Sequence, residues 1–591
     1  MTKYLYTAER AQQILVSLLK QAGIRKVVAS PGTTNISFVA SLMHDSFFEV
    51  YSSVDERSAA YLAVGLSEES GEPVVITCTG ATASRNYVPG LTEAFYRKIP
   101  VLAVTATQNE NRIGHMIPQV IDRSSFPKDV VTHSEHIPII RSLDDEWDAT
   151  IRLNRALLAL KHRGGGPVHI NLPTTYCRDF STSHLPEAHY IQRYTYDDNF
   201  PPMLSGRVGI LVGNHKIWPD ELKSAVNSFC DLYGAVIFCE HGSNYEGKYA
   251  VYNSLVNTQE KYESNSYSVD LLIHIGEVSG YGNTRCSPKT VWRVSEDGEL
   301  RDPFKKLSKV FEVSELFFFK QYVAKAKNSS DIQQKGGERW LDQCHNEYRK
   351  LISLIPDLPF SNIWLAQQTA QLLPKNSVLH LGILNSLRTW GFFEMSNFIR
   401  EHSFVNTGGF GIDGCMSSMI GGALARPDLT HFLVIGDLAF FYDLNVLGNR
   451  HIKNNVRILL VNNGKGTEFR NYNHMASMFG NDADALIAAA GHNGNKSEDL
   501  VRHFAKDLGY DYLHASNKSE YMQNIKQFVS EDELERPIIF EVFTTEKDES
   551  DALFMINNLV VSSKTVVKKT VGKALPKPIH RMLKGVLKSR G

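Results

Sequence analysis

The 591-residue sequence has few cysteines, no strong net charge and no long apolar run. Its seven cysteines are scattered without a CxxC pair, which is typical of a reduced, cytoplasmic protein. Lys and Arg total 63 against 64 Asp and Glu, so a generally basic nucleic-acid binder is disfavoured. No stretch reaches the roughly 18 apolar residues of a membrane span, and residues 1–23 favour an amphipathic helix over a signal peptide.

The sequence has the composition of a globular protein, with 42% apolar and 21% charged residues. The exception is residues 562–591, which hold seven Lys, two Arg and no acid, a net charge of +9. Three interpretations of this tail stay open: an amphipathic helix at an anionic membrane surface, a cover over the active site, or a solvated mobile end. Pro576 and Pro578 interrupt any long helix there.

Short apolar strands alternate with helical stretches along most of the chain, which predicts an α/β fold of doubly wound parallel sheets. The length fits three such domains, and the first and third could be similar folds. The domain boundaries that we predict are 1–185, 190–345 and 355–550, with a basic tail at 551–591. The clearest strands are 26–30, 48–54, 73–79, 100–107, 166–173, 207–213, 235–240, 270–277, 289–294, 310–315, 378–382, 431–437, 456–463 and 536–543.

Oxygen-bearing side chains follow two neighbouring strands of the third domain. Asp437 ends one apolar strand, and Asn462 and Asn463 end the next, with a crossover helix expected between them. Parallel strand ends face one edge of the sheet, where ligands bind. A carboxylate and an amide oxygen suit Mg²⁺, while Gly436 and the amides of the following helix suit a diphosphate. Turn residues at strand ends are the favoured explanation of either motif alone, but the two motifs together, at this separation, favour a ligand site.

This pattern resembles the diphosphate–Mg²⁺ signature of thiamine-diphosphate-dependent enzymes. The resemblance implies that Asp437, Asn463 and the peptide oxygen of Lys465 bind the metal, and that Gly436 and Leu438 lie on the cofactor. It also makes the three domains pyrimidine-binding, central Rossmann-like and diphosphate-binding. Family members build each active site from two subunits, which implies a homodimer or a homotetramer.

A second motif of the same family is a glutamate at a strand end in the first domain. Glu56 lies directly before a predicted helix, in VDERSAAYLAVGL. The resemblance implies that its carboxylate bonds the pyrimidine ring of the cofactor and favours the tautomer that takes a proton from the reacting carbon. The alternative is a helix-start glutamate that only complements the helix dipole.

Several segments resemble one branch, the menaquinone-pathway 2-succinyl-5-enolpyruvyl-6-hydroxy-3-cyclohexene-1-carboxylate synthases. The resemblance places Gly80, Gln119 and Ile412 against the cofactor. The segments are 30–35, 55–66, 78–96, 406–414 and 436–445.

The chain departs from that branch where its members bind polycarboxylate substrates with arginines. Thr33 and Thr34 stand where the branch has Ser-Arg, Gln108 and Asn109 follow the fourth strand in place of Asp-Arg-Pro, and Thr407 replaces the arginine of Asn-Arg-Gly. Because arginine forks grip carboxylates bidentately, their loss predicts another substrate, with Thr33 and Thr34 facing it.

Glu468 is a charge gained in NNGKGTE, near the position of the reacting carbon, and it is a candidate general acid or base. An exposed loop glutamate is the alternative. Ser386, Arg388 and Trp390 are candidates for contacting the donor's carboxylate and side chain, although packing would explain Trp390 equally well. His115 is more typical of a structural histidine than of a catalytic one.

We therefore expect a thiamine-diphosphate- and Mg²⁺-dependent decarboxylating carboligase, which joins a 2-oxo-acid-derived acyl carbanion to an unknown acceptor and does not perform the menaquinone reaction. One alternative is a simple decarboxylase of phosphonopyruvate, sulfopyruvate or pyruvate. The other is a non-catalytic relative that binds the cofactor. A nicotinamide enzyme is disfavoured because no GxGxxG follows the first predicted strand.

Overall fold

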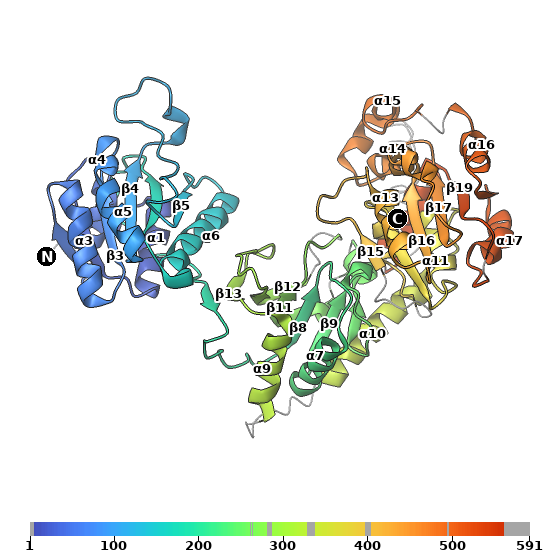
Figure 1. The fold of residues 1–591 in the computed structure, drawn as a ribbon, viewed down its shortest axis with the longest axis horizontal. Coiled ribbons are helices and arrows are strands. Elements are labelled where there is room, and N and C mark those ends of the chain that lie inside the picture. The colour runs from blue at the N-terminus through green and yellow to red at the C-terminus, as the bar shows by residue number, and fades with distance from the viewer. Residues whose placement is uncertain are drawn as a thin grey trace, which may run out of the picture. The chain divides into compact units, whose positions relative to one another are not determined.

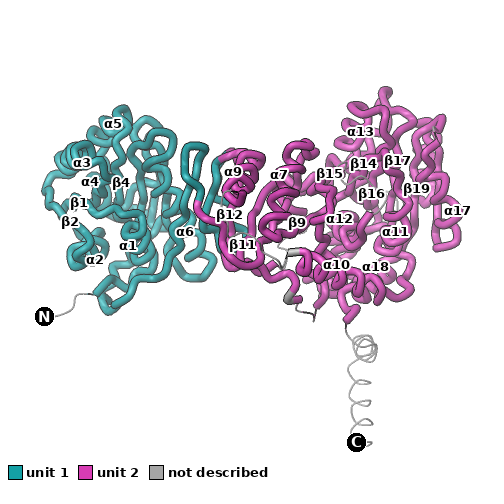
Figure 2. Tube along the Cα trace, turned by 90° about the horizontal axis from the view of Figure 1, so that it is seen from below, with its two compact units in different colours: residues 1–200, 297–312 teal, residues 201–296, 313–591 magenta. Residues whose placement is uncertain are grey.

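The computed structural model describes residues 5–260, 262, 264–280, 286–327, 337–395, 403–492, 496–532 and 534–560. The chain, drawn as a ribbon in Figure 1, forms two compact units, which Figure 2 shows in different colours. Unit 1 comprises residues 1–200 and 297–312, and unit 2 comprises residues 201–296 and 313–591. The basic segment 562–591, with its three interpretations, lies outside the described residues.

Unit 1 contains a six-stranded, entirely parallel sheet with the strand order β2-β1-β3-β4-β6-β5. Its strands are β1 (Lys26–Ala29), β2 (Glu49–Ser52), β3 (Val74–Cys78), β4 (Val101–Thr107), β5 (His133–His136) and β6 (Val168–Pro173). Two short strands of the same unit, β7 (Gln192–Tyr194) and β13 (Leu307–Phe311), pair in parallel with each other.

Helices cover both faces of this sheet, as alternate strand residues show. Val27 packs in a core with α1, α2 and α6, whereas Val28 packs in a second core with α3, α4 and α5. Gly90 permits the close approach of α5 to α3, since a Cβ there would lie 2.5 Å from the Cβ of Ala60. The helices are α1 (Arg10–Gln21), α2 (Ile36–Met43), α3 (Glu56–Ser70), α4 (Thr82–Asn86), α5 (Val88–Arg97) and α6 (Leu143–Ala159).

The first sheet of unit 2 is also parallel, with β10-β9-β8-β11-β12 as neighbours. Its core is rich in aromatic side chains, and Phe229 of α7 meets Phe319 of α9 edge to face. The elements are β8 (Val208–Val212), α7 (Asp220–Tyr233), β9 (Val236–Cys239), β10 (Ala250–Tyr252), α8 (Ser254–Asn257), β11 (Ser268–Ile275), β12 (Ser287–Val294), α9 (Glu315–Lys327) and α10 (Gly337–Leu354).

The second sheet of unit 2 is parallel, in the order β15-β14-β16-β17-β19-β18. α13, α14 and α16 pack on one face, and aromatic side chains of α11 and α17 join Phe540 on the other. Its elements are α11 (Asn362–Thr369), β14 (Ser377–Leu381), α12 (Asn385–Trp390), β15 (Ser403–Val405), α13 (Cys415–Ala425), β16 (Thr430–Gly436), α14 (Asp437–Tyr442), β17 (Val456–Asn462), α15 (Ala483–Leu486), α16 (Leu500–Asp507), β18 (Asp511–Ala515), α17 (Lys518–Phe528), β19 (Ile538–Phe543) and α18 (Glu546–Asn557).

The sheet of unit 1 and the second sheet of unit 2 share one topology. In each sheet, the first strand along the chain lies between the second and the third. The sixth strand lies between the fourth and the fifth. The prediction of three parallel α/β sheets is confirmed, and so is the likeness of the first and third. In such folds, ligands bind at the carboxyl ends of the two adjacent strands from which the strand order runs in opposite directions. Here these strands are β1 and β3 in unit 1, and β14 and β16 in unit 2.

Beyond the additional strands β5, β7, β10, β15 and β18, the structure differs from the prediction in three element bounds or connections. β13 ends at Phe311, not at residue 315, because α9 begins at Glu315. Between β16 and β17 lie only the short α14 and a 3-10 turn, Leu444–Gly448, where a full crossover helix was expected. α18 runs to Asn557, past the start predicted for the tail. Within the described part of the chain, no helix has the length and apolar character to cross a bilayer.

Candidate active site

The carboxyl ends of β14, β16 and β17 enclose a cavity of about 180 Å³ in unit 2. Each of the three strands contributes the segment that follows it, which explains why residues 80 positions apart meet. Eight of the residues predicted from the sequence line this cavity. They are Ser386, Ile412, Gly436, Asp437, Leu438, Asn463, Lys465 and Glu468.

Asp437 presents a buried carboxylate to the cavity. Its side chain is 5% exposed, and its Oδ1 accepts a hydrogen bond of 2.9 Å from the amide of Leu438. Burial raises the pKa of Asp437 to about 7, against the opposing effect of backbone hydrogen bonds. A carboxylate held out of water in this way gains stability from a bound cation.

The two asparagines after β17 have different partners. Asn462 donates to Glu541 Oε1 at 2.7 Å, and its own Oδ1 accepts from the amide of Gly464, so it serves the fold. Asn463 donates to the hydroxyl of Thr467 at 3.2 Å, but its Oδ1 is buried without a hydrogen-bond partner. A buried acceptor without a partner is rare, and a metal ion would satisfy it.

Glycines lie next to Asp437 and Ile412 at this cavity. A Cβ at Gly436 would meet nothing within 4 Å, so the space beside β16 is open to a ligand group. Ile412 follows a glycine-rich loop, residues 408–411, that leads into α13 and lines a neighbouring hollow of about 630 Å³. One carboxylate, one unsatisfied amide oxygen and open glycines fit a magnesium diphosphate.

A network of four charges holds the loop after β17 in place. Lys465 Nζ contacts Asp484 at 2.9 Å and Glu546 at 3.0 Å. Arg470 contacts the same two carboxylates, each at 2.9 Å. The side chain of Lys465 is therefore engaged with α15 and α18, which leaves only its peptide oxygen for the predicted metal contact.

Glu468 and Arg388 form an ion pair between the loop after β17 and α12. The Glu468 side chain is 15% exposed and that of Arg388 is 45% exposed. The two residues predicted to act on the substrate are thus brought together, with Glu468 on the cavity wall. The alternative of an exposed loop glutamate does not fit this degree of burial.

Trp390 occupies a different environment from the other candidates. It is 1% exposed, and its indole N–H donates to Asn362 Oδ1 at 3.2 Å. This burial favours a packing role for Trp390 over contact with the substrate. The backbone of Asn362 in turn donates to Glu549, whose pKa burial raises to about 7. Asn362 and Glu549 both line the cavity, and sequence reasoning missed them because neither stands in a strand-end motif.

Unit 1 gathers three of the residues predicted to bind cofactor or substrate. The Thr34 hydroxyl lies 2.9 Å from that of Thr79, at the ends of β1 and β3. A Cβ at Gly80 would lie 3.2 Å from the carbonyl oxygen of Gln119 and 3.9 Å from the Thr34 hydroxyl. Gln119 has a positive φ of 65°, which bends its loop at this point. Thr33 is exposed.

Glu56 is the first residue of α3, and Asp55 caps the helix by accepting a hydrogen bond from the amide of Ser58. The carboxylate of Glu56 accepts a hydrogen bond of 3.2 Å from Asn86 Nδ2. Asn86 fixes one carboxylate oxygen, and sequence reasoning missed it because an asparagine in a short helix carries no pattern of its own. His115 lies in the exposed loop after β4.

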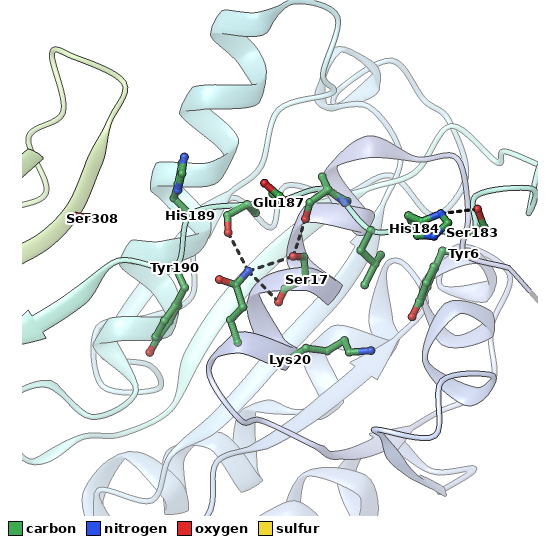
Figure 3. A pocket seen from close by; sticks show the side chains of 13 residues that line it. Tyr6, Ser17, Lys20, Ser183, His184, Glu187, His189, Tyr190 and Ser308 are labelled. Atoms are coloured by element: carbon green, nitrogen blue, oxygen red, sulfur yellow. Dashed lines mark hydrogen bonds between the residues drawn. The ribbon is translucent and has the colours of Figure 1, made fainter. Parts of the chain in front are cut away.

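A second cavity, of about 650 Å³, lies in unit 1 between α1 and residues 183–190 (Figure 3). Its polar groups bond to one another: Ser17 donates to the carbonyl of Pro186, and Gln21 donates to that of Ala188. None of the predicted catalytic or binding residues lines it. We therefore regard it as a surface hollow whose hydrogen bonds tie the segment to α1.

Comparison with known proteins finds one matching family and several similar chains. Residues 9–126 match the family described as thiamine pyrophosphate enzyme, N-terminal TPP binding domain. The chain is similar to proteins named 2-succinyl-5-enolpyruvyl-6-hydroxy-3-cyclohexene-1-carboxylate synthase. The one from Bacteroides fragilis is 30% identical over 91% of this chain and 97% of the relative. Those from Bacteroides thetaiotaomicron and Porphyromonas gingivalis are 29% and 27% identical, over 91% of this chain and 96% and 95% of theirs.

Proposed function

The chain belongs to the thiamine pyrophosphate enzyme family, and from that premise we propose that it is a Mg²⁺-dependent decarboxylating carboligase. A 2-oxo acid loses CO₂, and its acyl carbon is joined to an acceptor molecule. The observation that carries the proposal is the pairing, in one cavity, of the buried Asp437 carboxylate with the unsatisfied Oδ1 of Asn463.

The residues divide the work between binding and proton transfer. Asp437, Asn463 and the peptide oxygen of Lys465 would hold Mg²⁺, while the open space at Gly436, beside Leu438, would receive the diphosphate. Bound thiamine diphosphate would supply the nucleophilic carbon and the electron sink that decarboxylation of a 2-oxo acid requires. Glu56, oriented by Asn86, bonds the pyrimidine ring and keeps it in the proton-accepting tautomer.

We assign substrate contacts to the Glu468–Arg388 ion pair, of which Glu468 lines the cavity. Arg388 has five N–H donors, so it can hold Glu468 and still bond a carboxylate of the donor, beside Ser386. Glu468 then exchanges a proton with the acceptor during bond formation. Thr33 and Thr34 offer hydroxyls, and Thr407 an uncharged side chain, where bidentate arginines are absent, which supports an acceptor other than a polycarboxylate.

A second candidate is the reaction that gives the relatives their name. The similarity spans 91% of this chain and 97% of the Bacteroides fragilis protein, so no domain of the relative is missing. Detection of 2-succinyl-5-enolpyruvyl-6-hydroxy-3-cyclohexene-1-carboxylate by mass spectrometry, with the relatives' own substrates supplied, would favour this candidate. A different ligation product would favour our proposal.

The decisive experiment is CO₂ release from a panel of 2-oxo acids, with thiamine diphosphate and Mg²⁺, for the wild type and Glu56→Gln. We expect release from one or a few acids, faster in the presence of an acceptor, and a loss of at least about 100-fold in the variant because proton transfer is worth 10²–10⁴ in rate. Glu69→Gln, an exposed glutamate on the same helix, is the matched control and should keep full activity.

Three results would change the assignment. Rapid CO₂ release with an aldehyde as the only product would indicate a simple decarboxylase. Cofactor binding without turnover of any acid, with or without acceptors, would indicate a non-catalytic relative. Failure of the purified protein to bind thiamine diphosphate in calorimetry would contradict the proposal altogether.

A further inference from the structure

Thr467 is buried in the wall of the unit 2 cavity and accepts two amide donors. Its side chain is 3% exposed, and it opens the 3-10 turn Thr467–Arg470 that follows the predicted metal ligands. Its hydroxyl oxygen accepts from Asn463 Nδ2 at 3.2 Å and from Asn385 Nδ2 at 3.2 Å. Asn385 is the first residue of α12, so one oxygen connects the loop after β17 to the segment after β14.

An asparagine amide has two ends of equal size and opposite function. Its oxygen can bind a cation, whereas its NH₂ group can only donate and repels one. A half-turn about the last side-chain bond exchanges the two. Some neighbour must therefore fix the orientation if Asn463 is to present oxygen to a metal, as partners outside the ligand set do at metal sites generally.

We infer that Thr467 is the positioning residue that turns Asn463 Oδ1 toward the metal, an inference that rests on the proposed function. By accepting from Nδ2, the hydroxyl holds the NH₂ end against the loop and leaves Oδ1 as the buried atom without a partner. Because Asn385 fills another acceptor direction of the same oxygen, the hydroxyl cannot swing away without breaking a second hydrogen bond. Thr467 thus acts through Asn463 and does not itself touch the metal.

The test is the affinity of Mn²⁺, used as a paramagnetic probe of the Mg²⁺ site, measured by electron paramagnetic resonance with saturating thiamine diphosphate. Thr467→Val keeps the shape of the side chain and removes the acceptor, so we expect binding about 10–100-fold weaker. Thr467→Ser keeps the hydroxyl and should stay within about 3-fold of the wild type. No turnover is needed for this readout.

Thr369→Val is the matched control. Thr369 is fully buried in α11, and its hydroxyl lies 2.6 Å from that of Tyr521, away from the cavity residues. The same substitution there removes a buried hydrogen bond in the same unit. It should lower the melting temperature and leave Mn²⁺ affinity unchanged, which separates lost positioning from lost stability.

A double-mutant cycle with Asn463→Asp makes the test independent of folding differences. A carboxylate offers oxygen at both ends, so its orientation is immaterial to the metal. In that background Thr467→Val should change Mn²⁺ affinity less than about 3-fold. An equal penalty in both backgrounds, or unaltered affinity for Thr467→Val alone, would overturn the inference. A wild type that binds neither Mn²⁺ nor the cofactor would instead contradict the proposed function.

Discussion

Glu468 and Arg388 form an ion pair between two different elements. We predict that replacing Glu468 with glutamine has a large effect on catalysis and a small effect on stability. The Arg388 side chain is 45% exposed, so solvent screens the pair and its loss should cost under about 1 kcal/mol of unfolding free energy. Glu468→Gln removes proton exchange and should lower the rate of product formation by about 100-fold. Product assays and urea unfolding measure the two effects.

The exposed pair Lys518–Asp357 offers a comparison for this prediction. Lys518→Met also breaks a charge pair of unit 2, but away from the cavity, and should leave the rate of product formation unchanged. If Glu468→Gln and Lys518→Met behave alike, Glu468 has no catalytic task.

Glu240 predicts a pH dependence of stability in unit 2. It is 6% exposed, and burial raises its pKa to about 7 although Ser279 and the amide of Gly280 donate to it. The folded protein therefore binds this proton more tightly than the unfolded chain, so its stabilising contribution is full below about pH 4.5 and disappears as pH rises through about 7. The loss is on the order of 3 kcal/mol.

Glu240→Gln tests that dependence because glutamine mimics the protonated form and cannot ionise. Urea unfolding at about pH 5 and about pH 8 should show a smaller difference between the two conditions for the variant than for the wild type. The exposed Glu338→Gln should retain the wild-type difference. Identical pH dependence in Glu240→Gln and the wild type would contradict the assignment.

Of the candidate site, the sequence predicts only the residues that directly follow strands. Asp437 and Asn463 follow apolar strands, and parallel topology alone brings them to one edge. Which asparagine serves the metal depends on partners far along the chain, since Glu541 engages Asn462 from another strand. No sequence pattern points to Thr467, because its inferred role is to orient the amide of Asn463, and an orientation is not visible in the spacing of residues.

At the scale of elements, the loop after β17 depends on its four-charge network. Lys465→Met leaves Asp484 and Glu546 with Arg470 alone, so we expect faster hydrogen exchange across residues 463–487 and a loss of about 1 kcal/mol. Mass-spectrometric hydrogen exchange should find the change confined to this loop, with peptides of α17 unaltered.

Arg426→Met provides the control for the loop, because Arg426 pairs with Asp428 on the surface and its side chain is 48% exposed. It should leave exchange in residues 463–487 unchanged. Uniform acceleration over the whole of unit 2 in Lys465→Met would mean that the network supports global stability and not the loop.

Central strands could be predicted from the sequence, whereas most edge strands could not, β2 being the exception. β3, β4, β14 and β17 are mostly apolar and are buried at every residue, which is the pattern of a parallel sheet. β5 reads HSEH and β18 reads DYLHA, and both lie at sheet edges. Polar segments of this kind become strands only because a neighbouring strand supplies hydrogen bonds, and that neighbour is distant in the sequence.

At the scale of the whole molecule, the shared strand order of two sheets places one set of candidate residues in each unit. The ends of β1 and β3 carry Thr34 and Gly80, and the ends of β14 and β16 carry Ser386 and Asp437. Each set holds only part of what the proposed reaction requires. The resemblance to this family implies that such halves meet from two subunits, so we propose a homodimer or a homotetramer.

The surface of α3 supports this expectation and gives its test. Tyr61 and Leu62 are 47% and 44% exposed on the helix that begins with Glu56, and an apolar helix surface beside a binding residue is typical of an interface. Light scattering should give at least twice the chain mass of 66.4 kDa. Leu62→Asp should dissociate the assembly and weaken thiamine diphosphate binding together, whereas Met522→Asp, on the 43% exposed Met522 of α17, should do neither. A monomeric wild type, or a dissociated variant with unaltered cofactor affinity, would show that a single subunit holds a complete site.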